Sequence, residues 1–76
     1  MPLTELLVRI GQNLHQVRTR RNEKILTVAL SIHKSQSVIS QIEHGTYKCL
    51  SLTVLEKFAD YYKISIDEIM QPQIPV

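Results

Sequence analysis

The 76-residue chain contains very few of the residues that break or cross-link a fold. It has one cysteine and two glycines, and its three prolines, Pro2, Pro72 and Pro75, all lie near the ends. A single cysteine excludes an internal disulfide, which suits a reducing compartment such as the cytoplasm. Because no proline interrupts residues 3–71, nothing there forces a helix to end, and we expect an all-α chain.

The sequence also has no long apolar run, no targeting segment and no metal-binding pattern. No apolar stretch approaches the length of a membrane span, about 20 residues, and the N-terminus does not have the basic start and apolar centre of a signal peptide. The two glycines stand apart and cannot form a phosphate-cradling loop. We therefore expect no membrane association, metal, cofactor or enzymatic activity. The candidate metal ligands are scattered along the chain: His15, His33, His44 and Cys49.

Charge is small overall but unevenly distributed. The net charge is +2, yet residues 1–48 carry seven Lys or Arg and three Glu, whereas residues 49–76 carry two Lys and four acidic residues. The basic part would attract a polyanion, and the acidic part would face away from it. Hydrophobic residues make up 43% of the chain, which is enough for one small helical core.

Apolar spacing and capping residues predict five helices in a domain spanning residues 1–70. The first runs from Leu3 or Thr4 to Arg21 and ends at Asn22, which tolerates a left-handed backbone. The second and third cover about 25–32 and 36–44, and Gly45 ends the third. Residues 71–76 are expected to be a short flexible tail.

The last two predicted helices follow serine caps. Ser51 begins the fourth helix, and Ser65 begins the fifth, which covers about 66–70 and has a capping box formed with Glu68. The inner face of the fourth helix is expected to carry four apolar side chains, with Phe58 and Ala59 as alternatives for one of them: Leu52, Leu55, Phe58 or Ala59, and Tyr62.

The most informative segment is residues 25–45. Its spacing predicts two short helices separated by His33-Lys34-Ser35, with Ser35 as the N-cap of the second. Outward positions of this second helix carry amides and hydroxyls, where a solvated helix more often carries Glu and Lys. Because amides and hydroxyls can bond base edges in the DNA major groove, the segment points to DNA binding. These outward residues are Gln36, Ser37, Ser40 and Gln41.

Together these features resemble the small five-helix helix-turn-helix domains of the lambdoid phage repressor and Cro type, which include the xenobiotic-response-element type regulators of bacteria. The resemblance covers about residues 10–70. It implies a compact five-helix domain with a helix-turn-helix at about 25–44. The landmarks are Ile10-Gly11, Ala29, Ser37-x-x-Ser40, Ile39, Ile42, Glu43-x-Gly45 and residues 65–69.

The resemblance also implies site residues. Gln36, Ser37, Ser40 and Gln41 would contact bases, although a solvated polar face is the alternative. The residues expected to contact phosphate are Lys34, Ser35, His44, Thr46, Tyr47 and Lys48, and for Lys34 and Lys48 the alternative is a solvated surface charge. Arg18 is expected to form a partly buried structural ion pair with Glu43 that fixes the third helix against the first.

Four positions depart from the family's pattern. Ile25 replaces the usual phosphate-contacting Gln. His33 replaces the Gly of the turn, and we expect it to adopt an unusual backbone angle, which His tolerates. Leu26 and Leu30 stand where the family usually exposes Glu or Lys. Either the helix register shifts locally and both leucines join the core, which we favour, or they form an exposed apolar strip for a second protein.

The favoured hypothesis is a sequence-specific transcriptional regulator of bacterial or phage type that binds double-stranded DNA in the cytoplasm. One short helix contacts only a few base pairs, so we expect a homodimer on a two-fold symmetric operator. The controller protein of a restriction–modification system and the antitoxin of a toxin–antitoxin pair are narrower identities that fit. The alternative is a protein-interaction module that has kept the fold and lost DNA binding, with its partner at Leu26 and Leu30.

Overall fold

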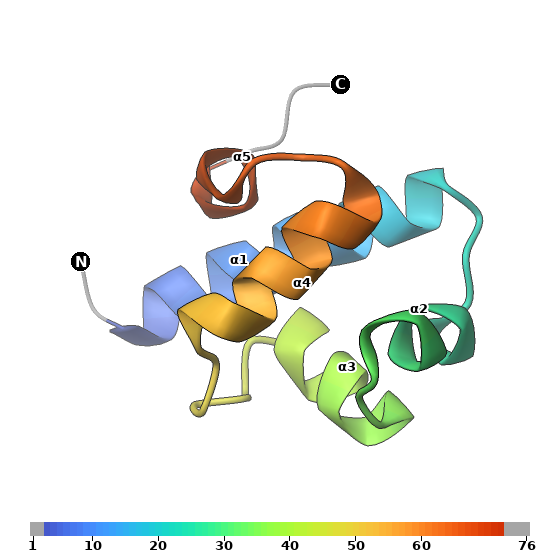
Figure 1. Cartoon of the computed structure of the whole chain (residues 1–76). Helices are drawn as coiled ribbons and strands as arrows, with labels where there is room; N and C mark the ends of the chain where they lie inside the picture. The colour runs from blue at the N-terminus through green and yellow to red at the C-terminus, as the bar shows by residue number, and fades with distance from the viewer. Residues whose placement is uncertain (1–2, 73–76) are drawn as a thin grey trace.

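The computed structural model describes residues 3–72, so most of the predicted tail, residues 73–76, lies outside the described part. The described residues form five helices and no strand, as the sequence predicts (Figure 1). The helices are α1 (Leu3–Arg20), α2 (Ile25–Ile32), α3 (Gln36–Glu43), α4 (Leu52–Tyr62) and α5 (Ile66–Met70).

The helices pack so that α1 connects the two ends of the domain. It contacts α3 on one side and α5 on the other, while α2 contacts both α3 and α4, and α4 contacts α5. Figure 1 shows α5 at the top of the molecule, with α2 and α3 at the bottom. Among the described residues, no helix is long and apolar enough to cross a membrane.

The helix ends follow the local chemistry that the sequence indicates. Ser35, Ser51 and Ser65 each accept a hydrogen bond from the backbone N–H three residues later, at 3.1 to 3.3 Å. The chain turns left-handed at Asn22, with φ 54°, and at His33, with φ 60°. The three serine caps and the two left-handed positions are therefore confirmed. Only half of the predicted capping box forms, because the Glu68 carboxylate accepts from the Ser65 hydroxyl at 3.4 Å rather than from the Ser65 backbone N–H. α3 ends one residue earlier than predicted, because His44 is its C-cap.

Apolar side chains from all five helices form the core, and two predictions about it are wrong. Leu52 is 68% exposed because it lies to one side of the α4 stripe, and Val54 is buried instead. Leu26 and Leu30 are 47% and 68% exposed, so they form a strip at the surface. The inner face of α2 is already filled by other residues. The core consists of Ile10, Leu14, Val28, Ala29, Ile32, Ile39, Ile42, Val54, Leu55, Phe58, Tyr62 and Ile69.

A buried amide that sequence reasoning missed fixes α5 to α1. The Asn13 side chain is 3% exposed, and its Nδ2 donates to the carbonyl oxygens of Ile69 and Gln71, each at 2.6 Å. Both carbonyls lie where α5 ends and have no partner further along the helix. The amide therefore satisfies the end of α5 while its own burial is compensated by hydrogen bonds.

The backbones of α1 and α3 meet at Gly11. A Cβ on Gly11 would lie 2.4 Å from the carbonyl oxygen of Ile42 and 2.6 Å from that of Glu43, which is closer than such atoms can approach. Only glycine therefore allows α3 to lie this close to α1.

We expect Gly11→Ala to lower the free energy of unfolding by about 1–3 kcal/mol, because the added methyl must push α3 away from α1. This loss would occur even though alanine favours a helix over glycine by up to about 1 kcal/mol. Urea denaturation followed by circular dichroism measures the change, with Gln12→Ala at the exposed neighbouring position as the control. An alanine variant as stable as the wild type would show that the contact can relax freely.

Candidate nucleic-acid interface

One side of α3 carries a row of uncharged polar side chains, which we call the polar stripe: Gln36, Ser37, Ser40 and Gln41. Three of the four are exposed and Ser40 is half-buried. On the opposite side of the helix, Ile39 and Ile42 are 0% and 2% exposed and anchor α3 in the core. The helix therefore presents amides and hydroxyls to solvent from a backbone that packing holds in place.

Two members of the polar stripe are bonded to each other. The Gln41 Nε2 donates to the Ser37 Oγ at 3.1 Å, one turn earlier on the helix. This bond uses one of the two amide hydrogens of Gln41 and leaves the other hydrogen and the carbonyl oxygen for a further partner. A paired donor and acceptor of this kind matches the major-groove edge of adenine.

The residues predicted to contact phosphate lie at the two ends of α3. Lys34 is half-buried just before the helix, and Tyr47 is half-buried after it and packs against the core. The Thr46 hydroxyl donates to the backbone carbonyl of Gln41 at 3.3 Å, which ties the following loop to the helix. The exposed members of this group are Ser35, His44, Thr46 and Lys48.

The ion pair expected between Arg18 and Glu43 is present and joins the end of α3 to α1. The Arg18 Nε lies 2.8 Å from the Glu43 Oε2, and the Arg18 Nη2 lies 3.0 Å from the Oε1. The Glu43 side chain is 3% exposed, and the hydrogen bond with it raises the pKa of Arg18. Arg18 Nη1 also donates to the backbone carbonyl of Glu23 at 2.8 Å, so one guanidinium holds α3 and the loop before α2.

A third residue, His15, takes part in this cluster, and sequence reasoning missed it. Its Nδ1 lies 2.8 Å from the Glu43 Oε1, while its side chain remains 55% exposed. The only signal in the sequence is its position one turn before Arg18 on α1. A surface hollow of about 240 Å³, which we call the histidine hollow, is lined by Gln12, His15, Glu43 and His44.

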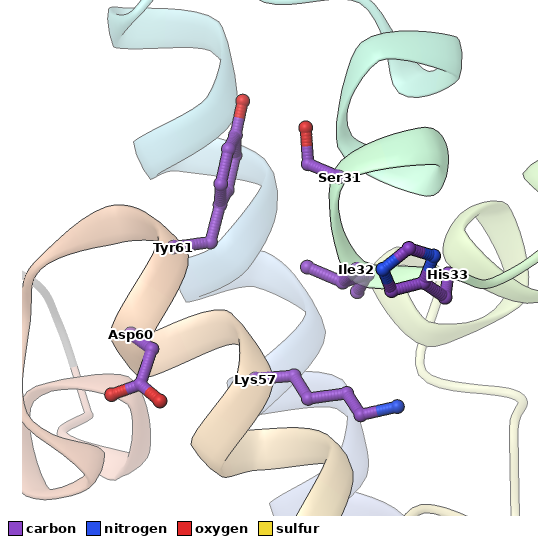
Figure 2. Close-up of a pocket in the computed structure, with 6 residues that line it drawn as sticks. All are labelled: Ser31, Ile32, His33, Lys57, Asp60 and Tyr61. Carbon is purple, nitrogen blue, oxygen red and sulfur yellow. The ribbon is translucent and has the colours of Figure 1, made fainter.

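A second hollow, of about 300 Å³, lies between α2 and α4. In Figure 2 the Asp60 carboxylate points away from Ser31, and the Lys57 side chain extends below Ile32 and His33. The Ser31 hydroxyl donates to the carbonyl of Thr27 at 2.8 Å. This hollow therefore does not place a hydroxyl nucleophile beside a base. Its lining residues are Ser31, Ile32, His33, Lys57, Asp60 and Tyr61.

Comparison with known proteins establishes the family of this fold and surface. Residues 17–69 match the helix-turn-helix family, and the chain belongs to this family in its Cro/C1 type. The class that the fold defines is therefore a DNA-binding transcriptional regulator. The resemblance inferred from the sequence is confirmed for both fold and class.

One solved structure gives a more particular likeness. The chain is similar to the restriction-modification controller protein C.AhdI from Aeromonas hydrophila, known from a high-resolution crystal structure. The two are 28% identical, the match covers 83% of this chain and 94% of that chain, and the TM-score is 0.76. The comparison with curated proteins finds no match.

We expect Arg18→Ala to lower the free energy of unfolding by about 3–5 kcal/mol, because it leaves the buried Glu43 carboxylate without its cation. Thermal denaturation followed by circular dichroism measures this as a lower melting temperature. Arg21→Ala is the matched control, since it removes an exposed pair with Glu23 and should have a much smaller effect. An unchanged melting temperature for Arg18→Ala would mean that the pair does not hold α3 in place.

Proposed function

We propose that this protein binds a two-fold symmetric DNA operator as a homodimer, with α3 of each protomer in the major groove. The polar stripe would then contact base edges, Gln36 and Gln41 through their amides and Ser37 and Ser40 through their hydroxyls. The observation that carries the proposal is this exposed uncharged row on a helix whose other side is fully buried. Membership of the helix-turn-helix family supports the same role for α3.

Affinity in this proposal comes from the residues at the two ends of α3. Lys34 and Lys48 supply positive charge to the DNA backbone, and the Ser35 cap leaves backbone N–H groups of the first turn facing a phosphate. His44, Thr46 and Tyr47 add donors after the helix. These contacts would set the position of the protein on the duplex, while the polar stripe would select the base sequence that is bound.

The proposal of a homodimer follows from the size of α3. A helix of eight residues contacts only a few base pairs, so a specific site requires two copies about 34–36 Å apart, one turn of the DNA. The likeness to C.AhdI supports the narrower proposal that the chain controls a restriction–modification system in the cytoplasm of a bacterium. Regulation would then result from operator occupancy, which blocks or recruits the polymerase.

A second candidate function rests on the exposed leucines of α2. Leu26 and Leu30 lie one turn apart at the surface of a helix that carries no charged side chain, and such a strip suits contact with another protein. Salt dependence separates the two candidates. Phosphate-driven binding weakens steeply as salt rises, whereas association through apolar surfaces does not.

Selection of bound sequences from a random double-stranded DNA pool, at physiological salt and micromolar protein, tests the proposed function. We expect an inverted repeat with a defined spacing, because each α3 contacts one half-site. If no sequence is enriched, specific DNA binding is rejected, and the search turns to a protein partner at Leu26 and Leu30.

We expect Gln36→Ala and Gln41→Ala each to weaken binding to the selected operator by about 1–3 kcal/mol and to change binding to random DNA little. Titrations of labelled duplexes measure both affinities. Lys48→Ala is the control, because loss of a phosphate contact weakens both duplexes alike and lowers the slope of log affinity against log salt by about one. Equal losses on the two duplexes for the glutamine variants would remove these side chains as base contacts.

A further inference from the structure

Two histidines line the histidine hollow, His15 on α1 and His44 directly after α3, and both have one ring nitrogen already bonded. The His15 Nδ1 lies 2.8 Å from the Glu43 Oε1, and the His44 Nδ1 lies 2.7 Å from the backbone carbonyl oxygen of Ser40. Both oxygens can only accept, so each Nδ1 carries a hydrogen. In both rings, Nε2 is therefore the nitrogen left for another partner.

The contact between His15 and Arg18 is also consistent with a hydrogen on the His15 Nδ1. The Arg18 Nη2 lies 3.2 Å from the His15 Nδ1 and 3.0 Å from the Glu43 Oε1. Since Nδ1 and Nη2 are then both donors, each directs its hydrogen to the same carboxylate oxygen rather than to the other. Arg18 and Glu43 balance each other in charge, and they are the charged groups that contact the His15 ring. The His15 ring is thereby held in place without a net charge beside it.

The chemistry of the hollow favours an anion over a metal ion. Within residues 3–72, no group of three or more His, Cys, Asp or Glu side chains could hold a metal ion. The Glu43 carboxylate is already bonded by Arg18 and His15. When protonated, both imidazoles instead offer a charged Nε2–H donor, and the Gln12 amide on the same rim is a further donor. These are donors that suit a phosphate.

The position of the histidine hollow indicates which part of the DNA it would face. His44 is exposed and directly follows α3, one turn after Ser40 of the polar stripe. Glu43 lies beside it and joins α3 to His15 on α1. A duplex lying along the polar stripe would therefore pass its sugar–phosphate backbone over this end of α3.

We propose that the histidine hollow binds a phosphate of the DNA backbone through His15 and His44, and that DNA binding takes up protons there. This inference rests on the proposed function, because it requires α3 to lie in the major groove. Histidine is the side chain that usually changes its charge between pH 5 and 8, and phosphate binds its protonated form. Affinity is therefore greatest below this range and is lost as the pH rises through it.

The test is the Kd for the operator duplex at pH 6 and pH 8, at constant ionic strength. We expect the wild type to bind about tenfold more tightly at pH 6 than at pH 8, which corresponds to about 1.4 kcal/mol of binding free energy. His15→Gln and His44→Gln should each reduce this ratio, and the double variant should bring it close to one. Each variant should lose less affinity at pH 8 than at pH 6.

His33→Asn, which replaces the third histidine of the chain, is the matched control. Asparagine tolerates the left-handed backbone of His33, so this variant keeps the turn and removes an imidazole that lines the other hollow. It should retain the pH response of the wild type. The proposal is overturned if the double variant keeps the full ratio, or if His33→Asn loses the ratio equally.

The salt dependence of the wild type separates this inference from the proposed function. Binding that weakens steeply with salt but does not change with pH would overturn only the histidine site. The absence of DNA binding at both pH values would overturn the proposed function, and the histidine site with it. Melting temperatures of all variants at pH 8 show whether any of them fails to fold.

Discussion

The backbone contact between α1 and α3 at Gly11 is the constraint on which the rest of the molecule depends. α3 has only eight residues and would not be stable as an isolated helix, so its orientation comes from what it packs against. The contact sets its distance from α1, the buried isoleucines set its rotation, and Arg18 bonds to its last residue. Together these restraints decide which side chains of α3 face solvent, and hence where the polar stripe points.

The proposed function assigns affinity and specificity to different chemistry. The polar stripe is uncharged, so under this proposal it would gain little from DNA of the wrong sequence. The cationic side chains stand at the ends of α3 instead. By contrast, α2 carries no charged side chain and exposes Leu26 and Leu30. The two helices of the motif therefore present different surfaces: α3 exposes amides and hydroxyls, whereas α2 exposes two leucines beside the hydroxyls of Thr27 and Ser31.

The sequence predicted most of the fold because local rules determine it. Serine caps, apolar spacing and the left-handed positions at Asn22 and His33 are properties of a few neighbouring residues, and the helices begin and end near the predicted positions. Periodicity also groups residues on one face of a helix. It does not show how wide a face the neighbouring helices cover, which is why Leu26, Leu30 and Leu52 were placed wrongly.

The parts of the site that sequence reasoning missed depend on partners far along the chain. His15 gains its role from Glu43, 28 residues later, and Asn13 from carbonyls at the end of α5. The spacing of His15 from Arg18 is a weak local signal for the first contact, and no local pattern indicates the second. The pair of Arg18 with Glu43 also joins residues far apart, 25 positions along the chain, and it was expected only because the family resemblance supplied it.

The left-handed helix ends have a consequence for the unfolded chain. Asn22, His33 and Lys63 adopt positive φ without being glycine, which costs roughly 1–2 kcal/mol for an ordinary residue and less for Asn. The two glycines stand where a Cβ would strike another backbone, Gly11 against α3 and Gly45 against Val8. A side chain at the other turns restricts the conformations open to the unfolded polypeptide, so less entropy is lost when it folds. The smaller unfolded ensemble thus offsets part of the torsional cost of the native turns. This offset matters most in a domain of this size.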